Sequence, residues 1–338
     1  MNAQKKPPSP ELYFKTIMAY RDTAALKGAI DLELFTAIGE GKKTVPEIAK
    51  RCNASERGIR ILCDYLVVIG FLTRHDNKYE LTQDSGIFLD KRSPAYLGVS
   101  TEFLLAPVNR AAYDDVAATV RKGGTVLPEE GNVSPENPVW VKFARSMAPL
   151  MALPAEALAG VVLGGETEPM KVLDIAAGHG LFGVTVARQN PNAKVVAVDW
   201  ANVLTVAKEN ANKAGVSNRY STIPGSAFDV ELGSGYDAVL ITNFFHHFDP
   251  LAIESFMRKV NTALKPSGKA FTLELVPNED RVSPDVPATF SMTMLASTPL
   301  GDAYTFSELD RIYKSAGFSQ NEIQQLPPTF FSVITSSR

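Results

Sequence analysis

The segment VLDIAAGHGLFGVTVARQNPNAKVVAVD, residues 172–199, carries the residue types best suited to binding a nucleotide-like cofactor. An apolar strand is predicted to end at Asp174, a turn containing Gly178 and Gly180 follows, and a second apolar strand ends at Asp199. Glycines let the backbone approach a ligand closely, and a carboxylate at the end of the second strand can hold ribose hydroxyls. The segment therefore predicts a strand–turn–helix–strand unit that binds an adenosine.

The glycine turn also fits the dinucleotide pattern GxGxxG, from Gly178 through Gly180 to Gly183. Three features favour S-adenosylmethionine instead. The carboxylate of Asp174 would repel a pyrophosphate but not a cationic sulfonium; no second phosphate-binding turn follows; and the chain closes on a hairpin unusual for dehydrogenases. We therefore expect S-adenosylmethionine as the cofactor, with a nicotinamide dinucleotide as the alternative.

Two adjacent histidines, His246 and His247, follow the apolar run at residues 236–245. Ligands bind at the carboxyl ends of parallel strands, and histidine titrates near neutral pH. A histidine at this place can take the proton of a hydroxyl group as the oxygen attacks a methyl group. Either His246 or His247 could be this general base, and a purely structural histidine is the other interpretation.

The composition excludes several classes of protein. The 338 residues suffice for two domains, and the net charge of −3 argues against a nucleic acid or a membrane surface as partner. Cys52 and Cys63 lack metal-ligand spacing and are expected to be buried thiols of a cytoplasmic protein, with no metal site. No apolar run is expected to span a bilayer, and residues 1–10 are expected to be a disordered lead without a signal peptide.

The first part of the chain, residues 11–165, is expected to be mainly helical. Apolar residues recur at helical spacing from residue 11 to the glycines Gly39 and Gly41, which predicts one long first helix. Such a helix must bury its apolar face somewhere, which favours a homodimer.

A winged-helix outline follows in the sequence. Helices are predicted to start at Thr44, in a capping box, and at Ser55, and a hairpin is predicted to turn at residues 76–77. The second helix is mostly apolar and carries Glu56 and Asp64, whereas a helix that reads DNA needs a basic exposed face. We expect a packing or dimerisation module that does not bind nucleic acid.

The second part, residues 166–338, alternates strands with helices, which predicts an α/β domain with a parallel, doubly wound sheet. The glycine-rich segment 164–169 is the predicted boundary between the two parts. The last two strands have no helix between them and are predicted to close the sheet as an antiparallel hairpin around Pro327 and Pro328.

The whole chain resembles the small-molecule O-methyltransferase family typified by the plant caffeate and flavonoid enzymes and the hydroxyindole enzymes. The matching segments are AIDLELFTAI, VLDIAAGHG, VVAVD, PGSAFD, NFFHHFD, ALKPSGK and TFSELDRIYKSAGF. The resemblance implies an N-terminal winged-helix dimerisation domain, a C-terminal Rossmann-like methyltransferase domain, S-adenosylmethionine as cofactor and a homodimer.

The resemblance also implies roles for cofactor-binding residues. The glycine turn would approach the amino acid moiety, Asp199 would hold the ribose, and the GSAF run would frame the adenine. Thr242 stands where plant members carry a lysine, so Arg145 is the candidate for the methionine carboxylate. The expected cofactor contacts are Asp174, Gly178, Gly180, Asp199, Trp200, Ser226, Ala227, Phe228, Asn243 and Arg145.

For catalysis, the resemblance places His246 on the family's basic histidine and His247 on the neighbouring aspartate. Glu274 matches the first of two acids that orient the histidine, and Asp302 is the candidate for the second, where the family's glutamate is missing. The acceptor pocket is expected to be apolar, although methionines at helical spacing are also typical of plain core. The candidates for its walls are Phe143, Met147, Met151, Phe290 and Met294.

These observations predict an S-adenosylmethionine-dependent methyltransferase that methylates a hydroxyl of an aromatic or polyketide-like small molecule. Three alternatives stay open at this point. The acceptor atom could be carbon or nitrogen on the same fold, the chain could be a non-catalytic regulator that binds S-adenosylmethionine, or it could be a nicotinamide oxidoreductase.

Overall fold

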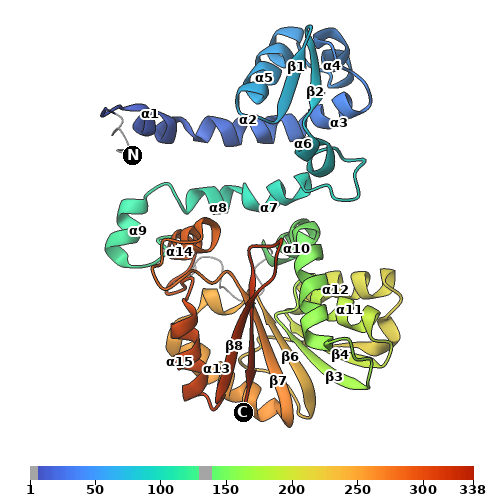
Figure 1. Cartoon of the computed structure of the whole chain (residues 1–338), viewed down its shortest axis with the longest axis vertical. Coiled ribbons are helices and arrows are strands. Elements are labelled where there is room, and N and C mark those ends of the chain that lie inside the picture. The colour runs from blue at the N-terminus through green and yellow to red at the C-terminus, as the bar shows by residue number, and fades with distance from the viewer. Residues whose placement is uncertain (1–6, 129–138) are drawn as a thin grey trace, which may run out of the picture. The chain divides into compact units, whose positions relative to one another are not determined.

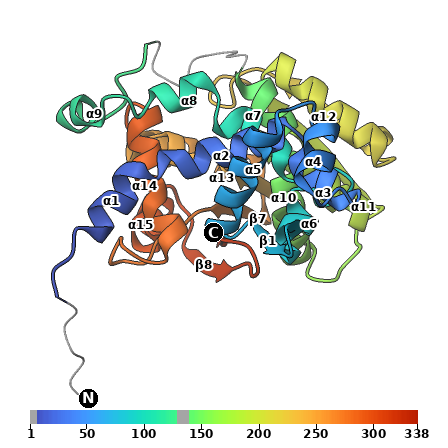
Figure 2. The same cartoon turned by 90° about the horizontal axis from the view of Figure 1, so that it is seen from above.

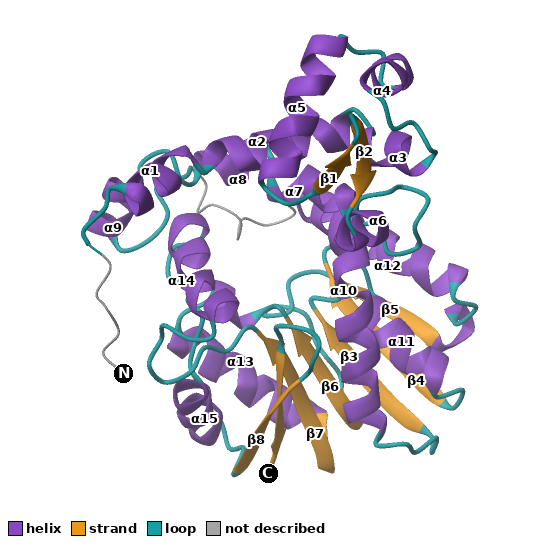
Figure 3. Cartoon of the chain, turned by 45° about the horizontal axis from the view of Figure 1, so that its top comes forward, coloured by secondary structure: helices purple, strands orange, loops and turns teal. Residues whose placement is uncertain are grey.

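The computed structural model describes residues 7–128 and 139–338. The chain divides into two compact units, one up to Thr101 and one from Glu102 onward (Figure 1). The first unit is helical apart from one small hairpin, whereas the second combines helices with a large sheet (Figure 3).

The first unit contains the predicted helix–helix–hairpin outline. Strands β1 and β2 pair antiparallel from Leu72↔Leu81 to His75↔Lys78, and positive φ angles at residues 76–77 form the turn. The elements are α1 (Glu11–Met18), α2 (Tyr20–Asp31), α3 (Leu34–Gly39), α4 (Val45–Arg51), α5 (Glu56–Val68), β1 (Leu72–His75), β2 (Lys78–Leu81), α6 (Gln83–Phe88) and η1 (Gly98–Ser100).

The helix starts at Thr44 and Ser55 are confirmed. Thr44 forms a capping box with Glu47, and the Ser55 hydroxyl accepts the N–H of Gly58 at 3.1 Å. The single long helix expected up to Gly41 is wrong, because α1, α2 and α3 are separate. Glu33 has a left-handed φ of 55°, which ends the helical run before α3.

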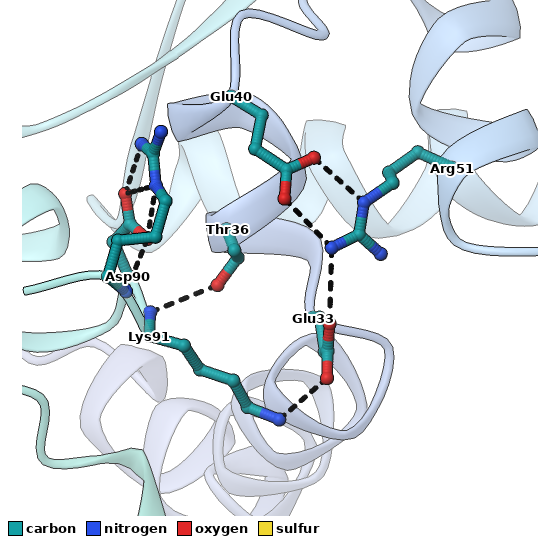
Figure 4. A network of polar contacts seen from close by, with 7 residues as sticks. Glu33, Thr36, Glu40, Arg51, Asp90 and Lys91 are labelled. Carbon is teal, nitrogen blue, oxygen red and sulfur yellow. Dashed lines mark hydrogen bonds and ion pairs between the residues drawn. The ribbon is translucent and has the colours of Figure 1, made fainter.

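A polar network ties three segments of the first unit together (Figure 4). Arg51, at the end of α4, donates to Glu40 at 2.8 Å and to Glu33 at 3.2 Å. Lys91, beyond α6, donates through Nζ to Glu33 at 2.7 Å and through its backbone N–H to the Thr36 hydroxyl at 3.0 Å. The network therefore holds the left-handed residue between α2 and α3 from two sides.

The second unit is built on a seven-stranded sheet with the strand order β5-β4-β3-β6-β7-β9-β8. The first five strands of that order are parallel, and β9 runs antiparallel to both β7 and β8. The strands are β3 (Met170–Ile175), β4 (Ala193–Asp199), β5 (Tyr220–Pro224), β6 (Tyr236–Thr242), β7 (Leu264–Glu274), β8 (Gln320–Gln325) and β9 (Ser332–Ser337). The predicted doubly wound sheet and its closing hairpin are confirmed.

Helices cover both faces of this sheet (Figures 1 and 2). One core lies under α10, α11 and α12 and includes Leu158, Val172 and Leu204, and the other lies under α13 and α15 and includes Val239, Phe256 and Ile312. The helices of the second unit are α7 (Thr101–Leu104), α8 (Pro107–Ala111), α9 (Val116–Lys122), α10 (Val139–Leu163), α11 (Leu181–Gln189), α12 (Ala201–Lys213), η3 (Ser217–Arg219), η4 (Phe245–His247), α13 (Pro250–Ala263), α14 (Asp285–Ser297) and α15 (Phe306–Ser315).

Helix α10 explains two differences from the sequence expectations. It packs against α11 and α12, which places residues 139–163 with the sheet, and the second unit begins at Glu102, whereas the predicted boundary lay at 164–169. By length and composition α10 is also apolar enough to cross a membrane, which the sequence reasoning had not expected. Its buried residues Met151, Ala155 and Leu158 belong to the core beneath the sheet, as in a core helix.

Candidate active site

Asp199, the last residue of β4, organises the glycine turn. Its Oδ2 accepts the N–H of Gly178 at 2.7 Å, and its Oδ1 accepts the N–H of Trp200 at 2.7 Å. Burial raises the pKa of Asp199 to about 6, although these two hydrogen bonds favour the carboxylate. Gly178 and Gly180 both have positive φ angles, and a Cβ on Gly180 would lie only 2.7 Å from the Tyr220 hydroxyl. Glycine is therefore required at the turn.

Asp174 lies on β3 and is fully buried. Its Oδ2 accepts the N–H of Gly183 in the first turn of α11 at 3.0 Å, while its Oδ1 has no hydrogen-bond partner among the described residues. Burial raises the pKa of Asp174 to about 7, and the charge of Asp199 adds to the rise. The observed bond is that of a helix cap, which was the alternative to cofactor contact for this residue.

The loop after β5 begins beside Asp199. The N–H of Gly225 donates to the Asp199 carbonyl at 2.9 Å, and the Ser226 hydroxyl accepts the N–H of Phe228 at 3.2 Å. The ring of Phe228 packs against those of Phe248 and Phe256, with centroids 4.9 and 5.0 Å apart. This loop therefore lies at the same sheet edge as the glycine turn, as the adenine-framing role requires.

A histidine–carboxylate pair lies at the ends of β6 and β7. His246 Nδ1 lies 2.6 Å from Glu274 Oε2, and both side chains are buried. Glu274 Oε1 accepts the backbone N–H groups of Phe244 and Phe245, each at 2.9 Å. A carboxylate on Nδ1 favours the tautomer with the proton on that nitrogen, which leaves Nε2 as a proton acceptor.

The structure does not bring Asp302 to His246 as predicted. Asp302 pairs instead with Arg281 at 3.3 Å and caps the N–H of Ala303, on a partly exposed loop. Among the described residues no hydrogen bond joins Asp302 to His246. The ring of Phe290, from α14, packs edge-on against His246 with centroids 4.9 Å apart, so apolar packing supports the ring where the second acid was expected.

Arg145 also differs from its predicted role at the methionine carboxylate. Its guanidinium makes two bonds to Glu209, at 2.9 and 3.0 Å, and both side chains are about half exposed. The structure shows the surface ion pair that was the alternative for this residue.

A series of ring contacts joins the histidines to α10 and α7. Centroid distances are 4.3 Å from His246 to His247, 5.4 Å from His247 to Trp140, 5.6 Å from Trp140 to Phe143, and 5.0 Å from Phe143 to Phe103. The structure thus places the predicted wall residue Phe143 near the histidines. Sequence reasoning missed Trp140 and Phe103, although the spacing of Trp140 and Phe143 by three helical residues was a usable signal.

The predicted methionines divide between wall and core. Met147 is half-buried on α10, whereas Met294 is buried on α14. Met151 is buried in the core beneath the sheet, and the side-chain amide of Asn243 donates to its sulfur at 3.6 Å. This contact joins Asn243 to α10. Met151 is therefore a core residue, which was the alternative to a place in the pocket wall.

His247 differs from His246 in having no carboxylate. Its Nδ1 is buried without a hydrogen-bond partner among the described residues. Burial lowers the pKa of His247 well below its usual range, and the neighbouring His246 adds to the effect. His247 is therefore neutral at physiological pH, and the carboxylate-bound His246 is the better placed base.

Two family models match this chain. The O-methyltransferase domain matches residues 139–319, and the O-methyltransferase dimerisation domain matches residues 14–91. The chain therefore belongs to the O-methyltransferase family, as the sequence resemblance implied. It is a methyltransferase that uses S-adenosylmethionine.

Individual relatives agree with this assignment. The chain is similar to a crystal structure from Nostoc punctiforme PCC 73102 described as an O-methyltransferase, with 51% identity, 98% and 100% of the two chains covered and a TM-score of 0.95. It is 28% identical to 3-hydroxy-5-methyl-1-naphthoate 3-O-methyltransferase of Streptomyces sahachiroi, over 88% of this chain and 86% of that protein. Human N-acetylserotonin methyltransferase, in complex with S-adenosylmethionine, shares the fold at 18% identity, with a TM-score of 0.84 over 100% and 99% of the chains.

The residues present fit S-adenosylmethionine. Gly178 and Gly180 have positive φ angles and carry no side chain on the turn, and Asp199 presents a carboxylate at the end of β4. No phosphate-binding pair of turns is needed for this cofactor, which carries no phosphate.

Asp174→Asn is expected to change how stability depends on pH. Because the pKa of Asp174 is about 7 in the folded state against a usual 3.8, the folded protein binds this proton more tightly than the unfolded chain. The resulting stabilisation is complete below about pH 4 and is lost as pH rises through about 7.

Urea unfolding of the ligand-free protein at pH 5 and pH 8 measures this effect. The wild type is expected to lose on the order of 2 kcal/mol more unfolding free energy over that interval than the Asp174→Asn variant. Parallel pH profiles for the two proteins would contradict a pKa of Asp174 that burial raises in the folded state.

Proposed function

We propose that this methyltransferase acts on a hydroxyl group of an aromatic or polyketide-like small molecule, with His246 as the general base. The observation that carries the proposal is the 2.6 Å contact between His246 Nδ1 and Glu274 Oε2, at the carboxyl edge of the sheet. A base is needed because a phenol with a pKa of about 10 is a weak nucleophile at neutral pH.

S-adenosylmethionine, when bound, supplies an electrophilic methyl group on a cationic sulfur. His246 Nε2 accepts the hydroxyl proton as the acceptor oxygen forms its bond to the methyl carbon and the carbon–sulfur bond breaks. Glu274 stabilises the resulting imidazolium, which then releases its proton to solvent. Two backbone N–H groups on Oε1 keep the Glu274 carboxylate in place throughout.

The residues for the cofactor lie at neighbouring strand ends. Asp199 would accept ribose hydroxyls, the glycine turn would admit the amino acid moiety, and residues 225–228 would frame the adenine. This placement is supported by the bond between the Gly225 N–H and the Asp199 carbonyl, which joins the adenine loop to the ribose position.

Two observations support a flat, aromatic acceptor. Rings from α7, α10 and α14 gather around the two histidines, and aromatic surfaces stack favourably on planar ligands. Curated relatives include a naphthoate 3-O-methyltransferase and an 8-O-methyl transferase of tetracenomycin polyketide synthesis. Acceptors of fused aromatic rings with a phenolic hydroxyl are the class we propose.

A cytoplasmic homodimer is the proposed form of the protein. The chain contains a dimerisation domain at residues 14–91, and α1 exposes five large apolar side chains, Leu12, Tyr13, Phe14, Ile17 and Met18. Both cysteines are free and buried, as is usual in a reducing compartment. We propose no role for nucleic acid or membrane binding.

His246→Ala is expected to lower kcat by about 10²- to 10⁴-fold with a panel of hydroxylated naphthoates, since the general base is lost. Calorimetric titration with S-adenosylhomocysteine should give an unchanged Kd, because the histidine does not hold the cofactor. Glu274→Gln should lower kcat to a similar extent: its carbonyl oxygen keeps the Phe244 and Phe245 N–H groups, but its NH2 group then faces Nδ1 and favours the tautomer with the proton on Nε2.

Product analysis separates this proposal from its alternatives. An unchanged kcat in His246→Ala, or a methyl group found on carbon or nitrogen of the product, would contradict an oxygen acceptor activated by this histidine.

Affinity for S-adenosylhomocysteine is expected to fall as pH drops below about 6. The ionised form of Asp199 is the one that accepts ribose hydrogen bonds, and its pKa in the ligand-free protein is about 6. Asp199→Asn should bind more weakly at pH 8 and lose this pH dependence. The matched control is Glu254→Gln on α13, where Glu254 pairs with Arg258 and with no other described residue. An equal response of both variants would contradict the role of Asp199.

A further inference from the structure

The adenine loop, defined as residues 225–230, is a small closed turn. The carbonyl of Ser226 accepts the N–H groups of Asp229 and Val230, each at 3.0 Å. Gly225 has a φ of 133°, and a Cβ there would lie 2.6 Å from a methyl group of Val230, so the two ends of the loop meet. Three backbone carbonyls of this loop, those of Ala227, Phe228 and Val230, accept hydrogen bonds from one cation.

Lys259, from α13, supplies that cation. Its Nζ donates to the carbonyl oxygens of Ala227 at 3.0 Å, Phe228 at 2.8 Å and Val230 at 2.6 Å. An ammonium group has three N–H donors, so all of them are used on this loop. Among the described residues no carboxylate pairs with Lys259. Its partners are three carbonyls of one short turn, and it therefore acts as a clamp on the backbone.

The helix that carries Lys259 begins shortly after His246. Helix α13 starts at Pro250, four residues after His246, and Asp249 is its N-cap. The adenine loop also contacts residues 244–248, the segment that contains His246. The ring centroid of Phe228 lies 4.9 Å from that of Phe248 and 5.8 Å from that of Phe244. A polar clamp and an aromatic cluster thus join the adenine loop to the segment that holds the base.

We propose that Lys259 is a positioning residue that fixes the adenine loop relative to His246, and so sets cofactor affinity without touching the reacting atoms. The inference rests on the proposed cofactor site. A loop already held in its bound conformation pays less conformational entropy when the cofactor binds, and the contacts of Lys259 hold residues 225–230 in this way. Lysine suits the position because its three donors radiate from one atom, whereas methionine offers none.

The test compares Lys259→Met with Arg258→Met, a control one residue away on the same helix. Arg258 is exposed and pairs with Glu254 at 2.5 Å, so both variants remove one cation from α13. Lys259→Met is expected to weaken S-adenosylhomocysteine binding, and to raise the KM for S-adenosylmethionine, by about tenfold with kcat nearly unchanged. Arg258→Met should leave both constants unchanged, and Lys259→Arg should restore part of the affinity.

Hydrogen exchange measures the same proposal in the folded, ligand-free protein. Backbone amides of residues 225–230 should exchange faster in Lys259→Met than in the wild type, while those of β4 and β6 keep their protection.

Equal S-adenosylhomocysteine affinity and equal loop exchange in Lys259→Met and wild type would overturn the role of Lys259 and leave the proposed cofactor site unaffected. A uniform rise in exchange across the sheet would also overturn it, because Lys259 would then serve general stability. If the wild type itself does not bind S-adenosylhomocysteine, the proposed cofactor site fails and this inference fails with it.

Discussion

The site depends on one buried carboxylate, that of Glu274 at the end of β7. A carboxylate removed from water is costly unless hydrogen bonds compensate for its lost hydration. Here Oε1 takes the N–H groups of Phe244 and Phe245, and Oε2 takes His246. These bonds fix the turn after β6, where Asn243 adopts a positive φ of 53°. The hydrogen bonds of Glu274 therefore set both the position and the tautomer of His246.

Strand order brings the other functional groups to the same edge. Because β3, β4, β5, β6 and β7 are parallel neighbours, their carboxyl ends meet, and each contributes to the site or to the turns around it. Asp174 secures the start of α11, Asp199 secures the glycine turn, and Glu274 secures the histidine. Each carboxylate binds backbone N–H groups of a turn that follows a strand, so the same kind of bond recurs at three strand ends.

The fold and half of the site were predictable from sequence because they depend on local patterns. Apolar runs ending in Asp174 and Asp199, the glycine turn and the paired histidines lie within short segments, and the parallel sheet follows from strand–helix alternation. The roles of Asp302 and Arg145 were not predictable, since each is set by a distant partner, Arg281 and Glu209. The prediction of one long first helix is wrong because the helical run is interrupted at Ala19, between α1 and α2, and again at the left-handed Glu33, between α2 and α3.

The most direct measurement of the central claim is the tautomer of His246, read by ¹⁵N NMR of histidine-labelled protein at pH 8 and assigned with a His246→Gln variant. The account predicts a neutral ring with the proton on Nδ1, held by Glu274, and an unprotonated Nε2. A ring with its proton on Nε2 would leave no base for the acceptor hydroxyl and would contradict the account.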